Sequence, residues 1–262
     1  MTLSNCGCNA SEVCDYTVEV VSNKKLADRN YWITFAAPEL AEKARPGLSV
    51  MVFPQGSELL LGRPFAVADA DKERGEISLC FFVLGAGTER LSQAKAGDIM
   101  KLRGFLGVPC KETEDNIILA CGGAGIGALC LTKRMKPETS RIWLGIPGRG
   151  YEAFAAHFKE LFPDTKIFTD DGSFGDGNSM FNELPRRPDD KTQIWSCGPE
   201  GFLKALYRHC ERPERLYFNL DKRMACGYGG CMGCVIETES GPKRVCVDQS
   251  MFRADEVNLD DN

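Results

Sequence analysis

Four cysteines near the C-terminus constrain the fold of this chain more than any other feature. Cys226, Cys231 and Cys234 have the spacing C-x4-C-x2-C, and Cys246 follows after eleven further residues. The first three match the spacing of a plant-type [2Fe-2S] site, in which thiolates hold the two irons. The glycines of this loop would let the backbone wrap closely around a cluster. The spacing therefore predicts a small C-terminal module that a metal centre holds together.

Zinc and unligated thiols are the two alternatives for these four cysteines. A tetrahedral zinc site usually has two separated C-x2-C pairs, whereas this loop has one such pair and single outer cysteines. The spacing favours iron and sulfur over zinc.

The other cysteines carry weaker signals. Five lie in or beside apolar runs and are predicted to behave as small buried hydrophobic residues: Cys80, Cys110, Cys121, Cys130 and Cys210. Cys6, Cys8 and Cys14 form C-x-C-x5-C near the N-terminus without an evident fourth ligand. A plain tail is favoured there over a metal or redox site.

Two different hydrophobic patterns precede the cysteine-rich loop. Between residues 14 and 110, short runs alternate apolar and polar positions and are separated by turn residues, which predicts an all-β barrel or sandwich. From residue 116, apolar strands alternate with helical stretches, which predicts a parallel sheet with covering helices. We therefore expect a multidomain chain: an N-terminal extension at 1–14, a β-barrel at 15–112, an α/β domain at 113–220 and a metal module at 221–262.

Charge and hydropathy exclude several classes of protein. The chain has 262 residues and a formal net charge of -5, without the run of basic residues that a nucleic acid would need. No apolar stretch is long enough to cross a bilayer, and the first residues do not resemble an export signal. We expect a cytoplasmic protein that binds neither nucleic acid nor membrane and keeps its thiols reduced.

Two glycine-bearing strand ends point to a nucleotide. Gly122-Gly123-Ala124-Gly125-Ile126-Gly127 follows an apolar strand and is expected to open a helix over 128–135, so that backbone amides could approach a pyrophosphate. The glycine loop alone is weak evidence for a nucleotide, and taken by itself it favours a structural turn. Cys197-Gly198-Pro199 ends a second apolar strand. Together, the two strand ends favour a nicotinamide nucleotide at the carboxyl edge of the sheet.

The β-rich segment contains one arginine beside a proline, in Arg63-Pro64-Phe65-Ala66. A guanidinium suits a bidentate phosphate contact, and Phe81 and Phe82 could lie against an isoalloxazine ring. From the residues alone, an ordinary surface arginine and core phenylalanines are the favoured interpretation.

Taken in order, these segments resemble the ferredoxin reductase-like flavoprotein superfamily. Within it, they are most similar to the electron transfer subunits of NAD-dependent (class 1B) dihydroorotate dehydrogenases. The resemblance covers about residues 15–257. It rests on the motifs at 63–66, 122–127, 169–175, 197–199 and 223–234, together with Cys246.

The resemblance implies an FAD-binding barrel, a NAD-binding α/β domain and a [2Fe-2S] module. The residues at FAD-contacting positions are Arg63, Pro64, Phe65, Ala66, Phe81, Phe82, Val83, Gly87 and Thr88. Those for NAD are Gly122, Gly123, Ala124, Gly125, Ile126, Gly127, Cys197, Gly198 and Pro199. The cluster ligands are Cys226, Cys231, Cys234 and Cys246. Ala66 departs from the family's usual serine, and the VDQSMF segment after Cys246 departs from its usual glycine-proline pair.

The function that the resemblance implies is electron transfer in pyrimidine biosynthesis. A separate FMN-containing subunit would oxidise dihydroorotate, and this chain would pass the electrons to NAD in a heterotetramer of two copies of each subunit. No catalytic side chain is expected, and His157 and His209 are predicted to be structural or exposed rather than catalytic. One alternative is a similar subunit of a sulfide dehydrogenase, sulfite reductase, hydrogenase or bifurcating transhydrogenase. The other is a non-enzymatic zinc module.

Overall fold

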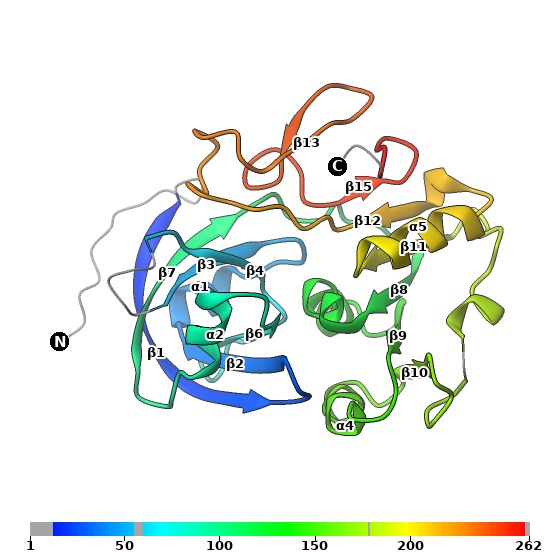
Figure 1. Cartoon of the computed structure of the whole chain (residues 1–262). Helices are drawn as coiled ribbons and strands as arrows, with labels where there is room; N and C mark the ends of the chain where they lie inside the picture. Colours follow the sequence, from blue (N-terminus) through cyan, green and yellow to red (C-terminus); the bar gives the residue numbers. More distant parts are fainter. Residues whose placement is uncertain (1–12, 55–59, 178, 260–262) are drawn as a thin grey trace.

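The protein consists of two large sheets side by side and a small module that lies across one end of both (Figure 1). The computed structural model describes residues 13–54, 60–177 and 179–259. Within these ranges, no helix is long and apolar enough to cross a membrane.

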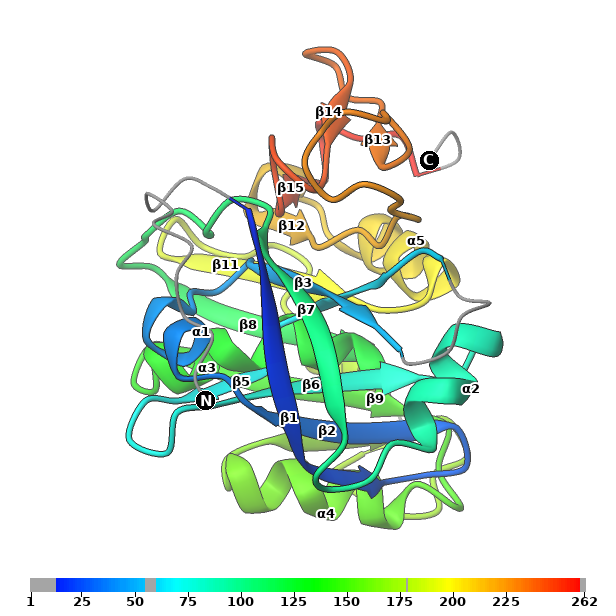
Figure 2. The ribbon, with the colours of Figure 1, turned by 90° about the vertical axis from the view of Figure 1, so that its left-hand side faces the viewer.

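The first sheet is antiparallel and contains seven strands in the order β4-β3-β7-β1-β2-β6-β5. It curls around its own core, with β1 crossing the face seen in Figure 2. Buried Ile33, Phe35 and Leu79 fill its interior. The strands are β1 (Cys14–Lys25), β2 (Asn30–Ala36), β3 (Ser49–Phe53), β4 (Arg63–Ala66), β5 (Asp69–Asp71), β6 (Glu76–Phe82) and β7 (Ile99–Leu106). The predicted all-β architecture is confirmed, and two short helices join it, α1 (Pro38–Lys43) and α2 (Ala86–Ser92).

The second sheet is parallel apart from one edge strand and has the order β10-β9-β8-β11-β12-β15. Its strands are β8 (Asn116–Gly122), β9 (Ser140–Ile146), β10 (Lys166–Thr169), β11 (Thr192–Cys197), β12 (Leu216–Phe218) and β15 (Phe252–Arg253). The helices are α3 (Cys130–Met135), α4 (Glu152–Leu161) and α5 (Glu200–His209), with short 3-10 turns η1 (Gly123–Ala128), η2 (Met180–Asn182) and η3 (Pro213–Arg215). The strand order reverses between β8 and β11, where doubly wound sheets bind their ligands.

The helix after the glycine loop begins later than the sequence predicts. Residues 123–128 form the 3-10 turn η1, and α3 starts only at Cys130. Glycine stabilises the α-helix poorly, and Gly123 has a φ of +51°, outside the right-handed helical region. The glycines therefore delay the helix and leave a tight turn at the strand end.

The C-terminal module contains the expected hairpin, with strands shorter than the sequence suggests: β13 (Val235–Ile236) and β14 (Lys243–Arg244). The module is fastened to both sheets. The amide of Gly107 donates to the Cys246 carbonyl at 2.7 Å, and Asn219 Nδ2 donates to the Ser250 carbonyl at 3.0 Å. Phe252, on β15, is completely buried beside β12. The module thus completes the edge of the second sheet.

Candidate functional site

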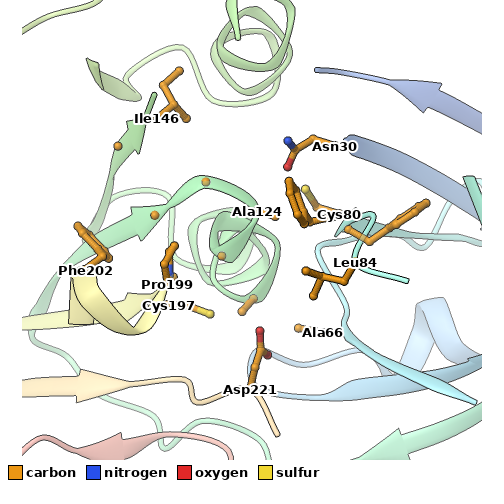
Figure 3. Close-up of a pocket in the computed structure, with 18 of the residues that line it drawn as sticks. Asn30, Ala66, Cys80, Leu84, Ala124, Ile146, Cys197, Pro199, Phe202 and Asp221 are labelled. Atoms are coloured by element: carbon orange, nitrogen blue, oxygen red, sulfur yellow. The ribbon is translucent and has the colours of Figure 1, made fainter. Parts of the chain in front are cut away.

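A cleft of about 1080 Å³ lies between the two sheets and collects most of the predicted nucleotide-binding residues (Figure 3). From the first sheet and its helix α2, the walls include Arg63, Pro64, Phe65, Ala66, Phe81, Phe82, Gly87 and Thr88. From the second, they include Gly122, Gly123, Ala124, Gly125, Cys197, Gly198 and Pro199. Three predicted residues do not line the cleft. Val83 and Ile126 are buried in the cores, and Gly127 packs against Cys80.

The wall from the first sheet combines an aromatic surface with a polar rim. The rings of Phe65 and Phe81 lie 5.6 Å apart. Arg63 crosses over Gly87 so closely that a Cβ on Gly87 would lie 1.9 Å from the arginine Nε. The Thr88 hydroxyl accepts hydrogen bonds from the backbone amides of Leu84 and Gly85, at 2.9 and 3.1 Å. The aromatic surface could therefore pack against a flat ring, and Arg63 could bind a phosphate beside it.

The opposite wall is built where two parallel strands end together. Cys121 of β8 pairs with Cys197 of β11, so the two glycine-bearing turns adjoin, as the sequence predicts. A Cβ on Gly125 would lie 2.3 Å from the Cys197 carbonyl oxygen, so only glycine allows this approach. Burial raises the pKa of the Cys197 thiol well above its usual value, which keeps it neutral.

Several residues of the cleft were not identified from the sequence. Asn30 begins β2 and Tyr151 directly precedes α4, and the two side chains are joined by a hydrogen bond of 3.2 Å. Asp221 follows β12 and points into the cleft (Figure 3). Its carboxyl group has no hydrogen bond or ion pair within the described part of the chain, and desolvation by the surrounding atoms raises its pKa, although part of the residue remains exposed to solvent. No sequence motif marks it, because only the tertiary fold brings the end of β12 to the cleft.

The four predicted cluster ligands come together as two pairs of sulfurs. The Cys234 and Cys246 sulfurs lie 3.3 Å apart and are buried, whereas the Cys226 thiol is hydrogen-bonded to Cys231, which is exposed. Desolvation would raise the pKa of Cys226, but amides of Tyr228, Cys231 and Gly230 point at its sulfur and lower the pKa to about 6.

Two pairs of sulfurs suit a two-iron cluster better than a single ion. Among the described residues, no three His, Cys, Asp or Glu side chains converge closely enough to hold one metal ion. A tetrahedral zinc ion needs its ligands around one centre, whereas a [2Fe-2S] cluster takes four cysteines across two irons. The backbone supports this arrangement, because Gly227, Gly229 and even Met232 have positive φ values.

The remaining cysteines and both histidines lie apart from these sites, with one exception. Cys80, Cys121, Cys130 and Cys210 are buried, as predicted, and Cys80 also lines the cleft, while Cys110 is half-buried. Cys14 opens β1 and is disulfide-bonded, contrary to the expectation of reduced thiols, while Cys6 and Cys8 lie outside the described residues. The His157 ring packs on Trp32, and His209 Nε2 lies 3.0 Å from the Leu184 carbonyl oxygen.

Solved structures with the same architecture define the class of protein. A chain of the NADH-dependent reduced ferredoxin-NADP oxidoreductase, an enzyme of flavin-based electron bifurcation, superposes with a TM-score of 0.80 at 27% identity. The match covers 98% of this chain and 92% of that one. Phthalate dioxygenase reductase shares the fold, with a TM-score of 0.64 at 15% identity over 90% of this chain and 95% of its own. The fold and site are those of a ferredoxin reductase-like flavoprotein with an iron-sulfur module.

Sequence relatives identify the family within this class. The model of the iron-sulfur cluster binding domain of dihydroorotate dehydrogenase B matches residues 221–258. The electron transfer subunit of dihydroorotate dehydrogenase B (NAD(+)) from Clostridium acetobutylicum is 31% identical, over 94% of this chain and 98% of the relative. Its counterpart from Geobacillus kaustophilus is 32% identical, over 92% and 97%. The chain belongs to the family of dihydroorotate dehydrogenase B electron transfer subunits.

Proposed function

We propose that this chain carries electrons to NAD+ from a catalytic subunit that oxidises dihydroorotate to orotate in pyrimidine biosynthesis. The observation that carries the proposal is the match, over almost the full length of both chains, to the Clostridium acetobutylicum subunit. The four-cysteine module, which matches the cluster-binding domain of the same enzyme, supports it independently. The chain would act as an oxidoreductase subunit with FAD, a [2Fe-2S] cluster and NAD.

The two walls of the cleft would bind different nucleotides, FAD on the side of the first sheet and NAD on the side of the second. Arg63, Gly87 and Thr88 would hold the FAD phosphates, and Phe65 and Phe81 would support its ring. Gly122, Gly125 and Gly198 would admit the NAD pyrophosphate at the carboxyl edge of the second sheet. When bound, the flavin exchanges two electrons with nicotinamide and single electrons with the cluster, so the protein needs no catalytic side chain. The other predicted residues along these walls, together with Val83, Ile126 and Gly127, would shape or buttress the same sites.

The catalytic partner would be an FMN-containing dihydroorotate dehydrogenase subunit, in a heterotetramer with two copies of each chain. The exposed Cys231 and its neighbours offer the partner a short route to the cluster. The chain would divide into an N-terminal extension at 1–14, an FAD-binding barrel at 15–112, a NAD-binding domain at 113–220 and a cluster module at 221–262. Because β15 pairs with β12, the cluster module is structurally continuous with the α/β domain.

One observation favours a second candidate function. The superposition on the bifurcating oxidoreductase covers more of this chain than the superposition on phthalate dioxygenase reductase. A subunit of a bifurcating transhydrogenase would use the same cofactors with a different partner.

The test is dihydroorotate-dependent NAD+ reduction by the complex that co-purifies anaerobically with the tagged chain. We expect turnover that falls at least 100-fold in Cys231→Ala, while Cys110→Ala, which removes a thiol outside the cluster module, retains it. NADH-dependent dye reduction without any dihydroorotate activity would contradict the proposed partner. Ferredoxin-dependent activity in the same preparation would then establish the second candidate.

A further inference from the structure

An arginine of the first sheet reaches across to the cluster loop. Arg103 lies on β7, and its Nη1 donates to the carbonyl oxygen of Cys226 at 3.1 Å. This hydrogen bond joins the barrel directly to the first of the four cysteines. The cluster loop therefore depends on a residue that lies more than one hundred positions earlier in the chain.

A carboxylate fixes the direction of this guanidinium. Arg103 Nε and Nη2 donate to the two carboxylate oxygens of Asp15, on β1, at 2.7 and 3.0 Å. Lys101 Nζ donates to the same carboxylate at 3.3 Å. The hydrogen bond to Asp15 raises the pKa of Arg103 and lowers that of Asp15, so both are ionised near neutral pH. Since two nitrogens engage Asp15, the third is aimed at the cysteine loop.

The surroundings restrict the arginine further. Its guanidinium carbon lies 5.2 Å from the Phe53 ring centre and 5.9 Å from that of Tyr228. The Arg103 side chain is 22% exposed, so solvent screens its charge only in part. The charge interacts favourably with the sulfur of Cys226.

We propose that Arg103, oriented by Asp15, positions the Cys226 segment and raises the reduction potential of the cluster. The proposal rests on the proposed function only in requiring that the four cysteines hold a [2Fe-2S] cluster. Reduction adds one negative charge to the cluster, and a nearby positive charge stabilises the reduced form more than the oxidised form. Asp15 opposes this effect while it holds the arginine in place.

The two halves of the ion pair therefore have opposite effects on the potential. Arg103→Gln removes the positive charge. The ratio of oxidised to reduced cluster at a given potential should rise about threefold, which lowers the reduction potential of the one-electron couple by about 30 mV. Asp15→Asn removes the negative charge, leaves two cations and should shift the potential upward. Arg103→Lys keeps the charge and should retain most of the wild-type value. A purely structural contact would not reverse sign between the two partners.

The experiment is an EPR-monitored redox titration of the full chain loaded with FAD and cluster. Arg134→Gln is the matched control, because Arg134 forms a similar two-bonded pair with Asp69, at 2.9 and 2.7 Å, away from the cluster loop. We expect its potential to equal that of the wild type. A wild-type protein without a reducible cluster signal would instead contradict the proposed function.

Equal potentials in the wild type and Arg103→Gln, or shifts of the same direction in Arg103→Gln and Asp15→Asn, would overturn the proposal. If Arg103→Gln fails to retain a cluster, the potentials of Asp15→Asn and Arg103→Lys test the proposal instead. An upward shift in Asp15→Asn with an unchanged Arg103→Lys supports the electrostatic role, and any other combination refutes it.

Discussion

Gly125 lies in the turn η1 after β8 and packs directly against the end of β11. A Cβ at this position would meet both the carbonyl carbon and the oxygen of Cys197, at 2.5 and 2.3 Å. These are backbone atoms, so no side chain can move aside to make room. The sequence shows a glycine here, but only the approach of the second strand explains why no other residue fits.

We therefore predict that Gly125→Ala separates the two strand ends. The unfolding free energy should fall by about 2 kcal/mol, in the range of other overpacked sites, and NADH affinity should fall at least tenfold. Gly201→Ala is the control, because a Cβ at Gly201 in α5 meets no atom within 4 Å. Denaturant titration and NADH binding measure both effects. Wild-type affinity in Gly125→Ala would show that the strand ends do not form the nucleotide site.

At the scale of elements, helix α4 fastens the second sheet to the first through aromatic contacts. The rings of His157 and Phe158 lie 4.7 and 5.8 Å from that of Trp32 on β2. Burial, followed by the charge of Lys24, lowers the pKa of His157 to about 4. The imidazole is therefore neutral in the folded protein at neutral pH.

This lowered pKa makes stability depend on pH. An unfolded histidine titrates near 6.5, so the unfolded chain binds more protons than the folded one between about pH 6.5 and 4. Stability should fall as the pH drops through that window, by about 1 kcal/mol between about pH 7 and 5 after allowance for partial exposure.

Denaturant unfolding at the two pH values, in the wild type and in His157→Gln, measures this contribution. The wild type should lose about 1 kcal/mol more than His157→Gln on acidification. His209→Gln is the matched control and should behave like the wild type. An identical pH dependence in all three proteins would rule out His157 as the source.

At the scale of the whole molecule, the cluster loop presents an exposed apolar edge. Tyr228 is 61% exposed and Met232 is 53% exposed, and both flank Cys231 in the loop. Exposed apolar side chains beside a redox centre are expected where a partner docks.

We predict that Tyr228→Glu weakens the complex with the catalytic subunit about tenfold, because it places a charge within the interface. NADH-dependent dye reduction by the isolated chain should not change, since the cleft is untouched. Met135→Glu, at an exposed methionine of α3, is the control. Light scattering and binding titration of the reconstituted complex measure the affinity. An unchanged affinity in Tyr228→Glu would place the partner elsewhere.

Much of this organisation could be predicted from the sequence because its signals are local. Alternating residues such as those of β1 and β6 indicate strands, and the glycines of 122–127 indicate a tight turn. The spacing of Cys226, Cys231 and Cys234 specifies a cluster loop within a few residues. The predicted start of the helix at residue 128 is wrong, because α3 begins at Cys130. A local pattern cannot show how far the preceding glycines delay a helix.

What the sequence determined by itself was the class of each segment, the cysteine module and the candidate ligands, because periodicity and spacing act over short distances. Only the tertiary structure decided which distant residues meet. It brought Asp221 into the cleft, joined Asn30 to Tyr151, and aimed Arg103 at Cys226. These contacts depend on the packing of one sheet against another, and that packing follows from the burial of apolar faces along the whole chain rather than from any motif.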